Sequence, residues 1–356
     1  MRGVYFKGNR ELEVTDFPDP TPGPGEVVVR IKASGLCGSD LKFYRDPPEE
    51  ALKALGFKDF SERGVTEVPK IVAGHEPCGV IEELGPGVDA RAWNVGDRVM
   101  VFHYKGCGYC DFCRTGWSQL CVQGATIYGA TAHGGHAEYI VVPAETLVTL
   151  PESISFSAGA AIACGTGTAF GAIKRANITG ADTVLIVGAG PIGQAAIQFA
   201  KALGCQVIVS DVTEDKLATA SRLGADYVID STKTDLIEAV KEFTKGRGAS
   251  AAIDTSGVPA ARRAATRALG TWGRIALVGL GGNIDLDVSP DLVIKQISVI
   301  GSYTFNNVGM GDCARFVADH DIDVDAVFSD RWNIEDAGKA YVEFDKQTRG
   351  KAVFEF

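Results

Sequence analysis

Hydrophobic positions follow two different rhythms along the chain. Up to about residue 152, short apolar or alternating runs such as EVVVRIKASGL (26–36) and GDRVMVF (96–102) are separated by turns rich in Gly and Pro. This pattern is typical of short β-strands. From about residue 180, apolar strand-like runs alternate with helix-like stretches. We therefore predict a mostly β region followed by an α/β region.

The α/β region contains six apolar runs with helical connections between them: TVLIVG, QVIVSD, DYVID, AAIDTSG, RIALVGL and SVIGSY. Six strands in this arrangement predict a doubly wound parallel sheet. From about residue 304 the pattern becomes mixed again, and the chain ends in KAVFEF, which we predict to be a strand. The pattern thus divides the chain into 1–152, 153–303 and 304–356.

The strongest fold signal is a glycine pattern at the end of the first of these six runs. Gly188, Gly190 and Gly193 form G-x-G-x-x-G where a strand gives way to a helix. Gly188 permits the tight turn, Gly190 lets the backbone approach a pyrophosphate, and Gly193 allows close helix packing. The helix N-terminus offers unpaired N–H groups to the phosphates. The pattern predicts a Rossmann-type dinucleotide site.

The residues that follow strengthen this prediction. Gly204 can cap the helix, and Asp211 ends the second strand roughly 20 residues after the glycine pattern. A carboxylate there can accept hydrogen bonds from ribose hydroxyls and would repel a 2′-phosphate, which favours NAD over NADP. The alternative is a glycine-rich turn with Asp211 as an ordinary residue at a strand end.

Composition and charge exclude several classes of partner. Lys and Arg number 35, Asp and Glu 45, and the formal net charge is −10. This acidity argues against a nucleic-acid partner, because no basic stripe is available to neutralise phosphates. The N-terminus has no apolar core of signal-peptide type. The uncharged run 153–173 consists largely of Gly, Ala, Ser and Thr, so we predict a buried helix there, not a membrane span. We expect a cytoplasmic protein without a membrane partner.

Four of the nine cysteines lie within fifteen residues, in CGYCDFCRTGWSQLC. Stable disulfides are rare in the cytosol, and the total is odd, so metal binding is the leading interpretation. A closed tetrahedral zinc shell with no open position fits the four thiols Cys107, Cys110, Cys113 and Cys121. Such a site would hold a loop and not a substrate. The alternatives are reduced cysteines without metal or a disulfide. His103, just upstream, is interpreted as a bystander because four sulfurs complete the shell.

A second group of candidate residues is scattered along the chain. These residues are Cys37, Ser39 and Asp40 in GLCGSDLK, His75 and Glu76 in GHEPCGV, and Cys164 and Thr168 in AIACGTGTAF. Each is ambiguous alone, because a lone Cys is usually buried and inert and a lone His is more often structural. Together they supply two sulfurs and one nitrogen, which would leave the fourth position of a zinc ion open for water or substrate.

These motifs, in this order, resemble those of the zinc-dependent medium-chain alcohol dehydrogenases. GHEPCGVIEELGPGV (74–88) matches the zinc signature of that family, and CGSD, the cysteine loop and GAGPIG follow the family's order. The resemblance covers essentially the whole chain. It implies an α/β fold with a Rossmann doubly wound parallel sheet (153–303) plus a mostly β GroES-like catalytic domain (1–152), to which residues 304–356 return.

The resemblance also implies the role of each candidate residue. A catalytic zinc would be held by Cys37, His75 and Cys164, and Glu76 would lie behind the metal as an exchangeable fourth ligand. Asp40 would orient His75, and Ser39 would pass on the proton of the substrate hydroxyl. The cysteine loop would be a structural zinc lobe, which gives two zinc ions per chain. The residues that would bind the cofactor are Thr168, Gly188, Gly190, Pro191, Ile192, Gly193, Asp211 and Val278.

The expected function is the NAD(H)-dependent interconversion of an alcohol (primary, secondary or polyol) and its aldehyde or ketone, with zinc as the Lewis acid. The alternatives are a zinc-free reductase of the same superfamily, a dehydrogenase of amino-alcohols or aldehyde adducts, and a non-catalytic nucleotide-binding relative. The resemblance further implies a homo-oligomer, with a tetramer favoured over a dimer. The small-molecule substrate itself stays open.

Two departures from the family's pattern affect these expectations. Where this chain has Lys42, many relatives carry a histidine that ends a proton relay from the active site to solvent. In this chain, Lys42 or water would replace that histidine. The segment between Cys37 and His75 is also longer than in typical relatives. We expect residues 45–69 either to form a lid that sets substrate choice or to be a solvent-facing or oligomer-contacting insertion.

Overall fold

The six apolar runs of the α/β region form one parallel sheet. The strands are β10 (Thr183–Val187), β11 (Gln206–Asp211), β12 (Tyr227–Asp230), β13 (Ala249–Asp254), β14 (Leu269–Leu277) and β15 (Ser298–Gly301). They lie in the order β12-β11-β10-β13-β14-β15, and every ladder is parallel. This is the strand order of a doubly wound fold. β10 is buried along nearly its whole length, which explains its uninterrupted apolar sequence. All six predicted strands are confirmed.

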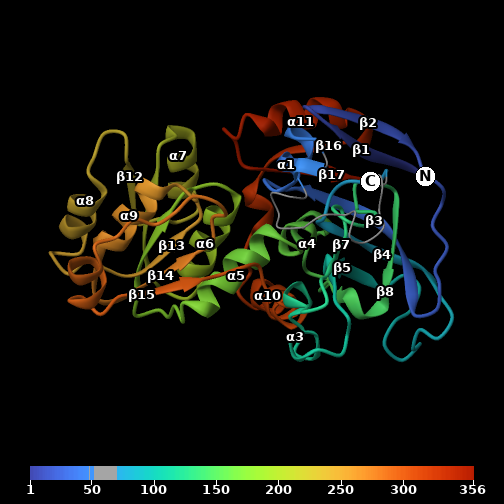
Figure 1. Ribbon diagram of the computed structural model, residues 1–356, viewed down its shortest axis with the longest axis horizontal. Coiled ribbons are helices and arrows are strands. Elements are labelled where there is room, and N and C mark those ends of the chain that lie inside the picture. The colour runs from blue at the N-terminus through green and yellow to red at the C-terminus, as the bar shows by residue number, and fades with distance from the viewer. Residues whose placement is uncertain (48, 52–69) are drawn as a thin grey trace.

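Helices connect these strands and cover both faces of the sheet (Figure 1). They are α6 (Pro191–Ala202), α7 (Glu214–Arg222), α8 (Leu236–Phe243) and α9 (Pro259–Ala268). Proline at the first position of α6 costs no hydrogen bond, because the first N–H groups of a helix have no intrahelical acceptor. Gly204 follows the end of α6 with φ of 87°, a conformation that favours glycine. The predicted helix and its cap are confirmed.

The second lobe is built on a larger, mostly antiparallel sheet. Along this sheet lie β16 (Phe328–Trp332), β17 (Lys351–Glu355), β3 (Glu26–Leu36), β4 (Pro77–Leu84), β5 (Arg98–Val101) and β9 (Leu147–Thr149), and β8 (Tyr139–Pro143) also pairs with β3. Two small ladders join β1 (Arg2–Gly8) to β2 (Glu11–Asp16) and β6 (Tyr104–Lys105) to β7 (Thr126–Ile127). The strands predicted in 26–36, in 96–102 and at the C-terminal end are therefore confirmed.

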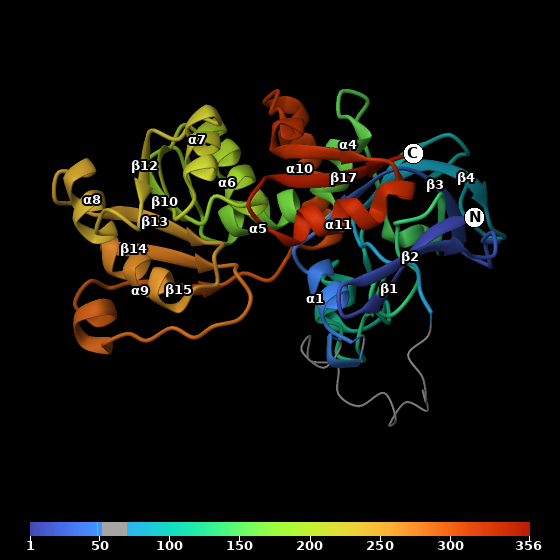
Figure 2. The same cartoon turned by 90° about the horizontal axis from the view of Figure 1, so that it is seen from above.

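The C-terminal segment returns to the lobe in which the chain begins. After α10 (Asn307–Asp319), β16 pairs in parallel with β17, which pairs antiparallel with β3. Figure 2 shows β17 and α11 (Ala337–Asp345) in the lobe that holds both chain termini. The domain boundaries after residues 152 and 303 stay predictions.

The run 153–173, predicted as one buried helix, is two helices. α4 (Phe156–Ile162) and α5 (Gly165–Arg175) meet at an angle of 49°. Cys164 breaks the helix, with φ −144° and ψ −81°, and so takes its thiol out of the helical path. Within the described part of the chain, no single helix has the length and hydropathy of a membrane span. This bent and buried pair reaches those limits only when its helices are taken together.

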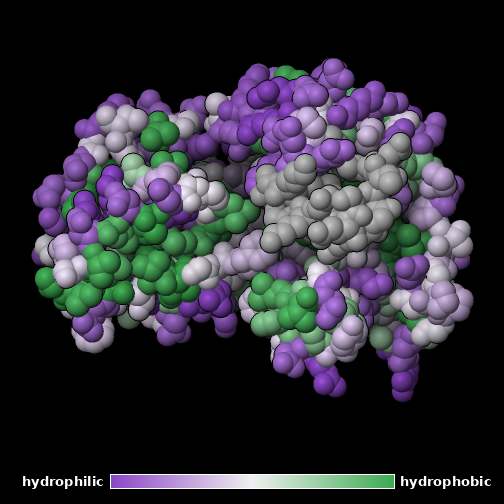
Figure 3. Space-filling view, in the orientation of Figure 1, coloured by the Kyte–Doolittle hydropathy of each residue, from purple (hydrophilic) through white to green (hydrophobic). Residues whose placement is uncertain are grey.

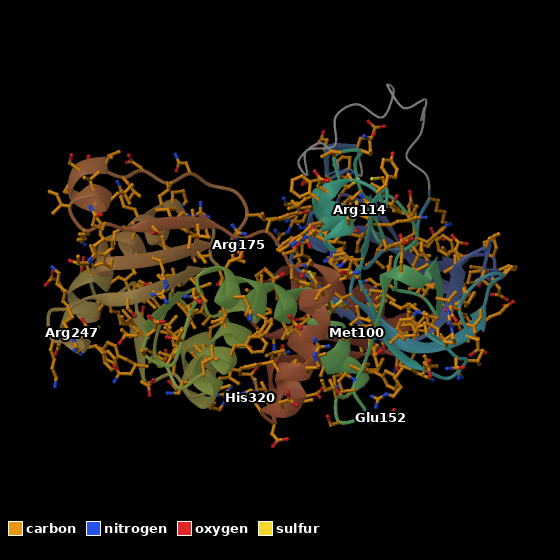
Figure 4. All side chains as sticks on the ribbon, turned by 90° about the horizontal axis from the view of Figure 1, so that it is seen from below. Met100, Arg114, Glu152, Arg175, Arg247 and His320 are labelled. Carbon is orange, nitrogen blue, oxygen red and sulfur yellow. The ribbon has the colours of Figure 1, made fainter. Side chains whose placement is uncertain are left out.

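One hydrophobic core runs through both lobes. It extends from Met100 on β5 through α4 and α5 to Ile186 on β10. Glycines on α5 permit this close packing, because a Cβ on Gly167 would lie 2.6 Å from the Phe305 ring. Figure 4 labels Arg175 at the end of α5, and its Nε donates a hydrogen bond to the carbonyl of Gly301 on β15 (2.9 Å). The helix pair therefore joins the two sheets.

The structure, a computed structural model, describes residues 1–47, 49–51 and 70–356. Residues 48 and 52–69 of the expected lid at 45–69 therefore lie outside the described residues. α1 (Asp40–Arg45), which carries Lys42, begins directly after Ser39.

Candidate metal and cofactor sites

Four donor side chains from three distant segments converge at the first candidate metal site. Cys37 follows β3, His75 and Glu76 precede β4, and Cys164 lies at the break between α4 and α5. One ligand atom from each of these residues lies within 4.8 Å of the others. The two sulfurs are 3.9 Å apart. Two thiolates bound at about 2.3 Å in a tetrahedral zinc shell lie about 3.8 Å apart. The donor set therefore fits zinc.

The pKa values of the two thiols of this cluster shift in opposite directions. The hydrogen bond from the Cys164 thiol lowers the pKa of Cys37 well below its usual range, and His75 acts in the same direction. The same hydrogen bond raises the pKa of Cys164, together with burial. Because the thiolate is the form that binds metal, the protein itself favours the ligand form of Cys37.

Asp40 fixes the orientation of the His75 ring. The His75 Nδ1–H donates a hydrogen bond to Asp40 Oδ1 (2.7 Å), which leaves Nε2 for the cluster. Asp40 is 2% exposed, and its other oxygen accepts the backbone N–H of Cys37 (2.9 Å). Ser39 occupies the N-cap of α1 but makes no capping bond. Its hydroxyl lies 3.3 Å from the Cys37 sulfur and 3.2 Å from His75 Nε2. The hydroxyl therefore lies directly beside the ligand atoms.

Glu76 and Lys351 form a buried ion pair behind the cluster. The carboxylate is fully buried, Lys351 is 2% exposed, and Lys351 Nζ lies 2.5 Å from Glu76 Oε2. Lys351 also donates to the Leu36 carbonyl (3.1 Å). Burial raises the pKa of Glu76 to about 8, although the charge of Lys351 opposes the shift. Gly35 leaves room for this carboxylate, because a Cβ there would collide with it. The sequence analysis missed Lys351, whose one signal was a lysine at the start of an apolar strand.

His103 lies against the first candidate metal site. Its ring centroid is 4.9 Å from that of His75, and its side chain is buried. Burial and the neighbouring His75 lower its pKa well below the usual range, so the ring is neutral at physiological pH. Its Nδ1 has no hydrogen-bond partner among the described residues. Neither donor cluster includes it, but its position next to His75 was not predicted.

The second candidate metal site lies entirely within the cysteine loop, around α3 (Asp111–Arg114), whose last residue, Arg114, is labelled in Figure 4. The sulfurs of all four predicted cysteines, Cys107, Cys110, Cys113 and Cys121, lie within 4.8 Å of one another. Backbone N–H groups stabilise the thiolates: Cys107 N donates to Cys121 Sγ (3.3 Å), and Cys110 N donates to Cys107 Sγ (3.4 Å). Backbone hydrogen bonds lower the pKa of Cys110 to about 6. Four sulfurs in this arrangement fit a closed zinc shell without a substrate position.

The glycine loop between β10 and α6 has the predicted geometry. Gly188 has φ of 93°, a conformation that favours glycine. A Cβ on Gly193 would collide with the carbonyl of Gly188, so only glycine allows α6 to approach the strand. A Cβ on Gly190 would have no other atom within 4 Å. Open space at Gly190 and the N-terminus of α6 together form a place for a pyrophosphate.

Asp211 lies at the end of β11, beside this loop. Its Oδ2 accepts the backbone N–H of Ala189 (2.7 Å), and its Oδ1 accepts those of Val212 and Thr213 (2.8 and 2.9 Å). The carboxylate is thus fixed next to the glycine loop. These contacts also give it a structural role, which is the alternative that the sequence left open.

The remaining predicted cofactor residues lie on α5, at the start of α6 and directly after β14. Thr168 is buried on α5, one turn after Cys164, and Val278 directly follows β14. Pro191 and Ile192 form the first turn of α6. A Cβ on Gly165 would lie 4.0 Å from Glu76 Oε1 and 4.0 Å from Ile192 Cγ1. The metal cluster and the nucleotide loop therefore meet at the start of α5.

Comparison with known proteins identifies the class. The family model "Alcohol dehydrogenase GroES-like domain" matches residues 23–152, and "Zinc-binding dehydrogenase" matches residues 191–318. An uncharacterised zinc-type alcohol dehydrogenase-like protein of Escherichia coli (strain K12) is 36% identical over 100% of this chain and 99% of its own length. An alcohol dehydrogenase of Geobacillus stearothermophilus is 32% identical over 98% of this chain and 96% of its own length. The chain belongs to the zinc-dependent medium-chain alcohol dehydrogenase family.

A solved structure supports the same assignment. The crystal structure of an alcohol dehydrogenase from Escherichia coli CFT073, complexed with the cofactor NADH, superposes with a TM-score of 0.85 at 28% identity and covers 100% of this chain and 99% of that one. The fold class predicted from the sequence, a Rossmann sheet plus a GroES-like domain, is confirmed. Zinc and NAD are the metal and cofactor of the family to which the chain belongs.

Proposed function

We propose that this protein is a zinc-dependent NAD(H) oxidoreductase that interconverts an alcohol and its aldehyde or ketone. The observation that carries the proposal is the convergence of Cys37, His75, Glu76 and Cys164, next to a dinucleotide loop that meets them at Gly165. When bound, zinc would supply a Lewis acid for the substrate oxygen and NAD would supply the hydride acceptor.

The side chains around the cluster have separate tasks in this proposal. Ser39 takes the proton of the substrate hydroxyl, because its Oγ is the hydroxyl beside the donor atoms. Asp40 keeps the proton of His75 on Nδ1. Thr168 holds the nicotinamide side of the cofactor, and the adjoining lobes exclude water while hydride moves. Lys42, on α1, or water would carry the proton to solvent in place of the histidine found in many relatives.

We further propose two zinc ions per chain, one in each cluster, and a preference for NAD over NADP. The four-sulfur loop supports the structural zinc. Asp211, fixed beside the glycine loop, supports NAD, because its charge would repel a 2′-phosphate. The proposed location is the cytoplasm, a reducing compartment, because six of the nine cysteines would bind zinc as thiolates in this proposal.

The substrate is proposed to carry a second polar group. The Nδ1 of His103 has no hydrogen-bond partner among the described residues, and its ring lies beside that of His75, so a hydroxyl or amino group of the substrate could satisfy it. This favours polyols and amino-alcohols over alcohols with a single hydroxyl. A non-catalytic nucleotide-binding protein is the competing proposal.

The test is NADH formation from a panel of primary alcohols, polyols and amino-alcohols. We expect His75→Ala to reduce turnover by at least about 1,000-fold, since a metal Lewis acid contributes several kcal/mol. His320→Ala is the matched control, because His320 is exposed on the far end of α10 and should turn over normally. Wild-type protein that binds NADH but oxidises no alcohol or aldehyde adduct would support the non-catalytic alternative.

We also propose that the chain forms a homo-oligomer through the edge strand β15. One side of β15 pairs with β14, and its other side has no strand partner within the described chain. Apolar side chains lie exposed around this edge, including Trp272 (72%), Ile294 (74%) and Val299 (40%). Figure 3 shows hydrophobic side chains gathered over this lobe. A second copy can cover the patch and extend the sheet, and a tetramer would need one further contact.

The oligomer proposal is tested by light scattering of the intact protein and of Val299→Lys. We expect the variant to have a lower mass, because a charge would be buried in the contact. Val95→Lys is the control, since Val95 is also an exposed valine (64%, against 40% for Val299) but lies in the other lobe. A wild-type mass of 37.6 kDa, that of one chain, would contradict the proposal.

A further inference from the structure

Asp40 is the end point of a line of buried polar groups that the function above does not use. Its Oδ2 accepts the backbone N–H of Cys37 and lies 3.5 Å from the hydroxyl of Tyr341 on α11. That hydroxyl is 2.8 Å from His136 Nε2, and His136 Nδ1 is 2.7 Å from the hydroxyl of Ser34 on β3. Ser34, His136 and Tyr341 are all fully buried, so these contacts are their hydrogen-bonding environment.

We propose that Ser34, His136 and Tyr341 form a directed hydrogen-bond chain that ends on Asp40 and thereby holds the zinc ligand His75 in position. The three are positioning residues, and the inference rests on the proposed metal site at Cys37, His75 and Cys164. The link to the metal is the Asp40–His75 hydrogen bond of 2.7 Å.

Proton counting sets the direction of the chain. A tyrosine hydroxyl has one proton, so Tyr341 cannot donate to both His136 and Asp40. If Tyr341 donated to His136, Asp40 would face a tyrosine lone pair inside the protein. Every group is satisfied when Ser34 donates to Nδ1, Nε2–H donates to Tyr341, and Tyr341 donates to Asp40. This arrangement requires the neutral Nε2–H form of His136. Burial lowers the pKa of His136 to about 4, in agreement with a neutral ring.

The surroundings argue that these polar atoms have a purpose beyond packing. Tyr341 and His136 lie in an aromatic cluster: the Tyr341 ring is 4.9 Å from Phe6, and the His136 ring is 4.9 Å from Phe354. Phenylalanine in either place would fill similar space without a buried polar atom. A buried polar group costs free energy unless it is hydrogen-bonded, so packing alone does not call for a hydroxyl and an imidazole.

The backbone around His136 reaches the same ligand from a second side. Gly135 N donates to the carbonyl of Gly74 (2.8 Å), and His136 N donates to that of Ala73 (2.8 Å). A Cβ on Gly74 would collide with the His136 ring, so Gly74, with φ of 83°, lets the ring lie directly on the residue before His75. His136 therefore supports His75 both through this backbone contact and through Tyr341 and Asp40.

The test measures zinc binding, not turnover. Chelator competition on the wild-type protein should show two zinc-release steps, and the step that is absent in His75→Ala belongs to the catalytic site. Groups that hydrogen-bond a ligand typically change metal affinity by about 10–100-fold, and a group one step further out should do less. We expect the zinc affinity of the catalytic site to fall by about tenfold in Tyr341→Phe, several-fold in His136→Phe and about twofold in Ser34→Ala. The zinc affinity of the other site should be unchanged.

Tyr44→Phe is the matched control. Tyr44 is buried, and its ring is 5.3 Å from that of Tyr341, but its hydroxyl is not part of the chain. We expect the zinc affinity of the catalytic site in this variant to equal that of the wild type. The inference would be overturned if the Tyr341→Phe variant bound zinc as tightly as the wild type, or if both sites of the variant lost affinity equally. A wild-type protein that shows no zinc release from the catalytic site would overturn the proposed function as well.

A second measurement applies to the wild-type protein alone. Nitrogen-15 NMR of labelled histidine separates the two neutral ring forms, and the His136 ring signal is assigned in the wild type through its own backbone resonances. We expect His136 to carry its proton on Nε2. A proton on Nδ1 would reverse the chain and contradict the inference even if a variant failed to fold.

Discussion

The two candidate zinc sites are built in opposite ways. The four sulfurs of the cysteine loop come from fifteen consecutive residues, are half-exposed in part, and are supported by the backbone N–H groups of the same loop. The catalytic cluster draws its donors from three distant segments, is largely buried, and is supported by side chains from a fourth segment, near the C-terminal end. A local site can hold a loop, whereas a site assembled by the whole fold can hold its ligands rigidly beside a cofactor.

The largest effect should follow from breaking the local site. Cys110→Ser removes one of four ligands of a structural metal, and structural zinc binding contributes directly to folding. We expect most of the protein to become insoluble at 37 °C and the Tm of the remainder to fall. Cys205→Ser is the control, because Cys205 lies outside both clusters and its sulfur donates only to the Thr179 carbonyl, which a hydroxyl can replace. Thermal unfolding measures the Tm of both variants, and equal Tm values would show that the loop does not depend on the Cys110 thiol.

Two serine variants, one beside the first cluster and one in the cysteine loop, should distinguish a site that serves chemistry from one that supports the fold. We expect Ser39→Ala to slow alcohol oxidation by about 10²–10⁴-fold, the usual contribution of general acid–base groups, with zinc content and NAD affinity unchanged. Ser118→Ala, in the cysteine loop, should leave kcat unchanged. Steady-state kinetics on both variants provides the comparison. Ser39→Ala with the wild-type rate would mean that another group carries the proton.

The buried support of the catalytic cluster should matter for stability as well. Lys351→Met leaves the buried Glu76 without its partner, and breaking such a pair costs about 3–5 kcal/mol. Adding Glu76→Gln should recover much of that loss, because a neutral amide replaces a buried carboxyl that would otherwise have to take up a proton or stay charged without Lys351. Lys241→Met, in an exposed pair with Glu238, should cost at most about 0.5 kcal/mol. Urea unfolding measures these three variants and the single Glu76→Gln variant, and additive losses in the double variant would contradict the pairing.

The smallest expected effect concerns the cofactor. Asp211→Ser removes a charge beside the proposed ribose site, where unit charges interact by roughly 1–4 kcal/mol. We expect the ratio of kcat/KM for NAD to kcat/KM for NADP to fall by about tenfold or more. Asp230→Ser is the control, because Asp230 ends the neighbouring strand in register with Asp211. A wild-type enzyme that prefers NADP would contradict the assignment.

The same contrast explains what could be predicted from the sequence. The cysteine loop, the glycine loop and the strands are local patterns, and each is found where its spacing or periodicity indicated. Cys37, His75 and Cys164 do not adjoin in sequence, so only the resemblance to a family grouped them. Lys351 and Tyr341 contact residues about 300 positions earlier, and nothing in their own neighbourhood signals those contacts. The bend at Cys164 was missed because its neighbours are all good helix or turn residues.

The central claim is that the chain holds two independent zinc sites, only one of which serves chemistry. Elemental analysis of metal-replete protein tests it most directly when three proteins are compared. We predict two zinc ions per chain in the wild type, and one in His75→Ala, which remains folded but inactive. We also predict one in the soluble fraction of Cys110→Ser. A wild-type protein with one zinc or none, or a His75→Ala variant that keeps both, would contradict the account.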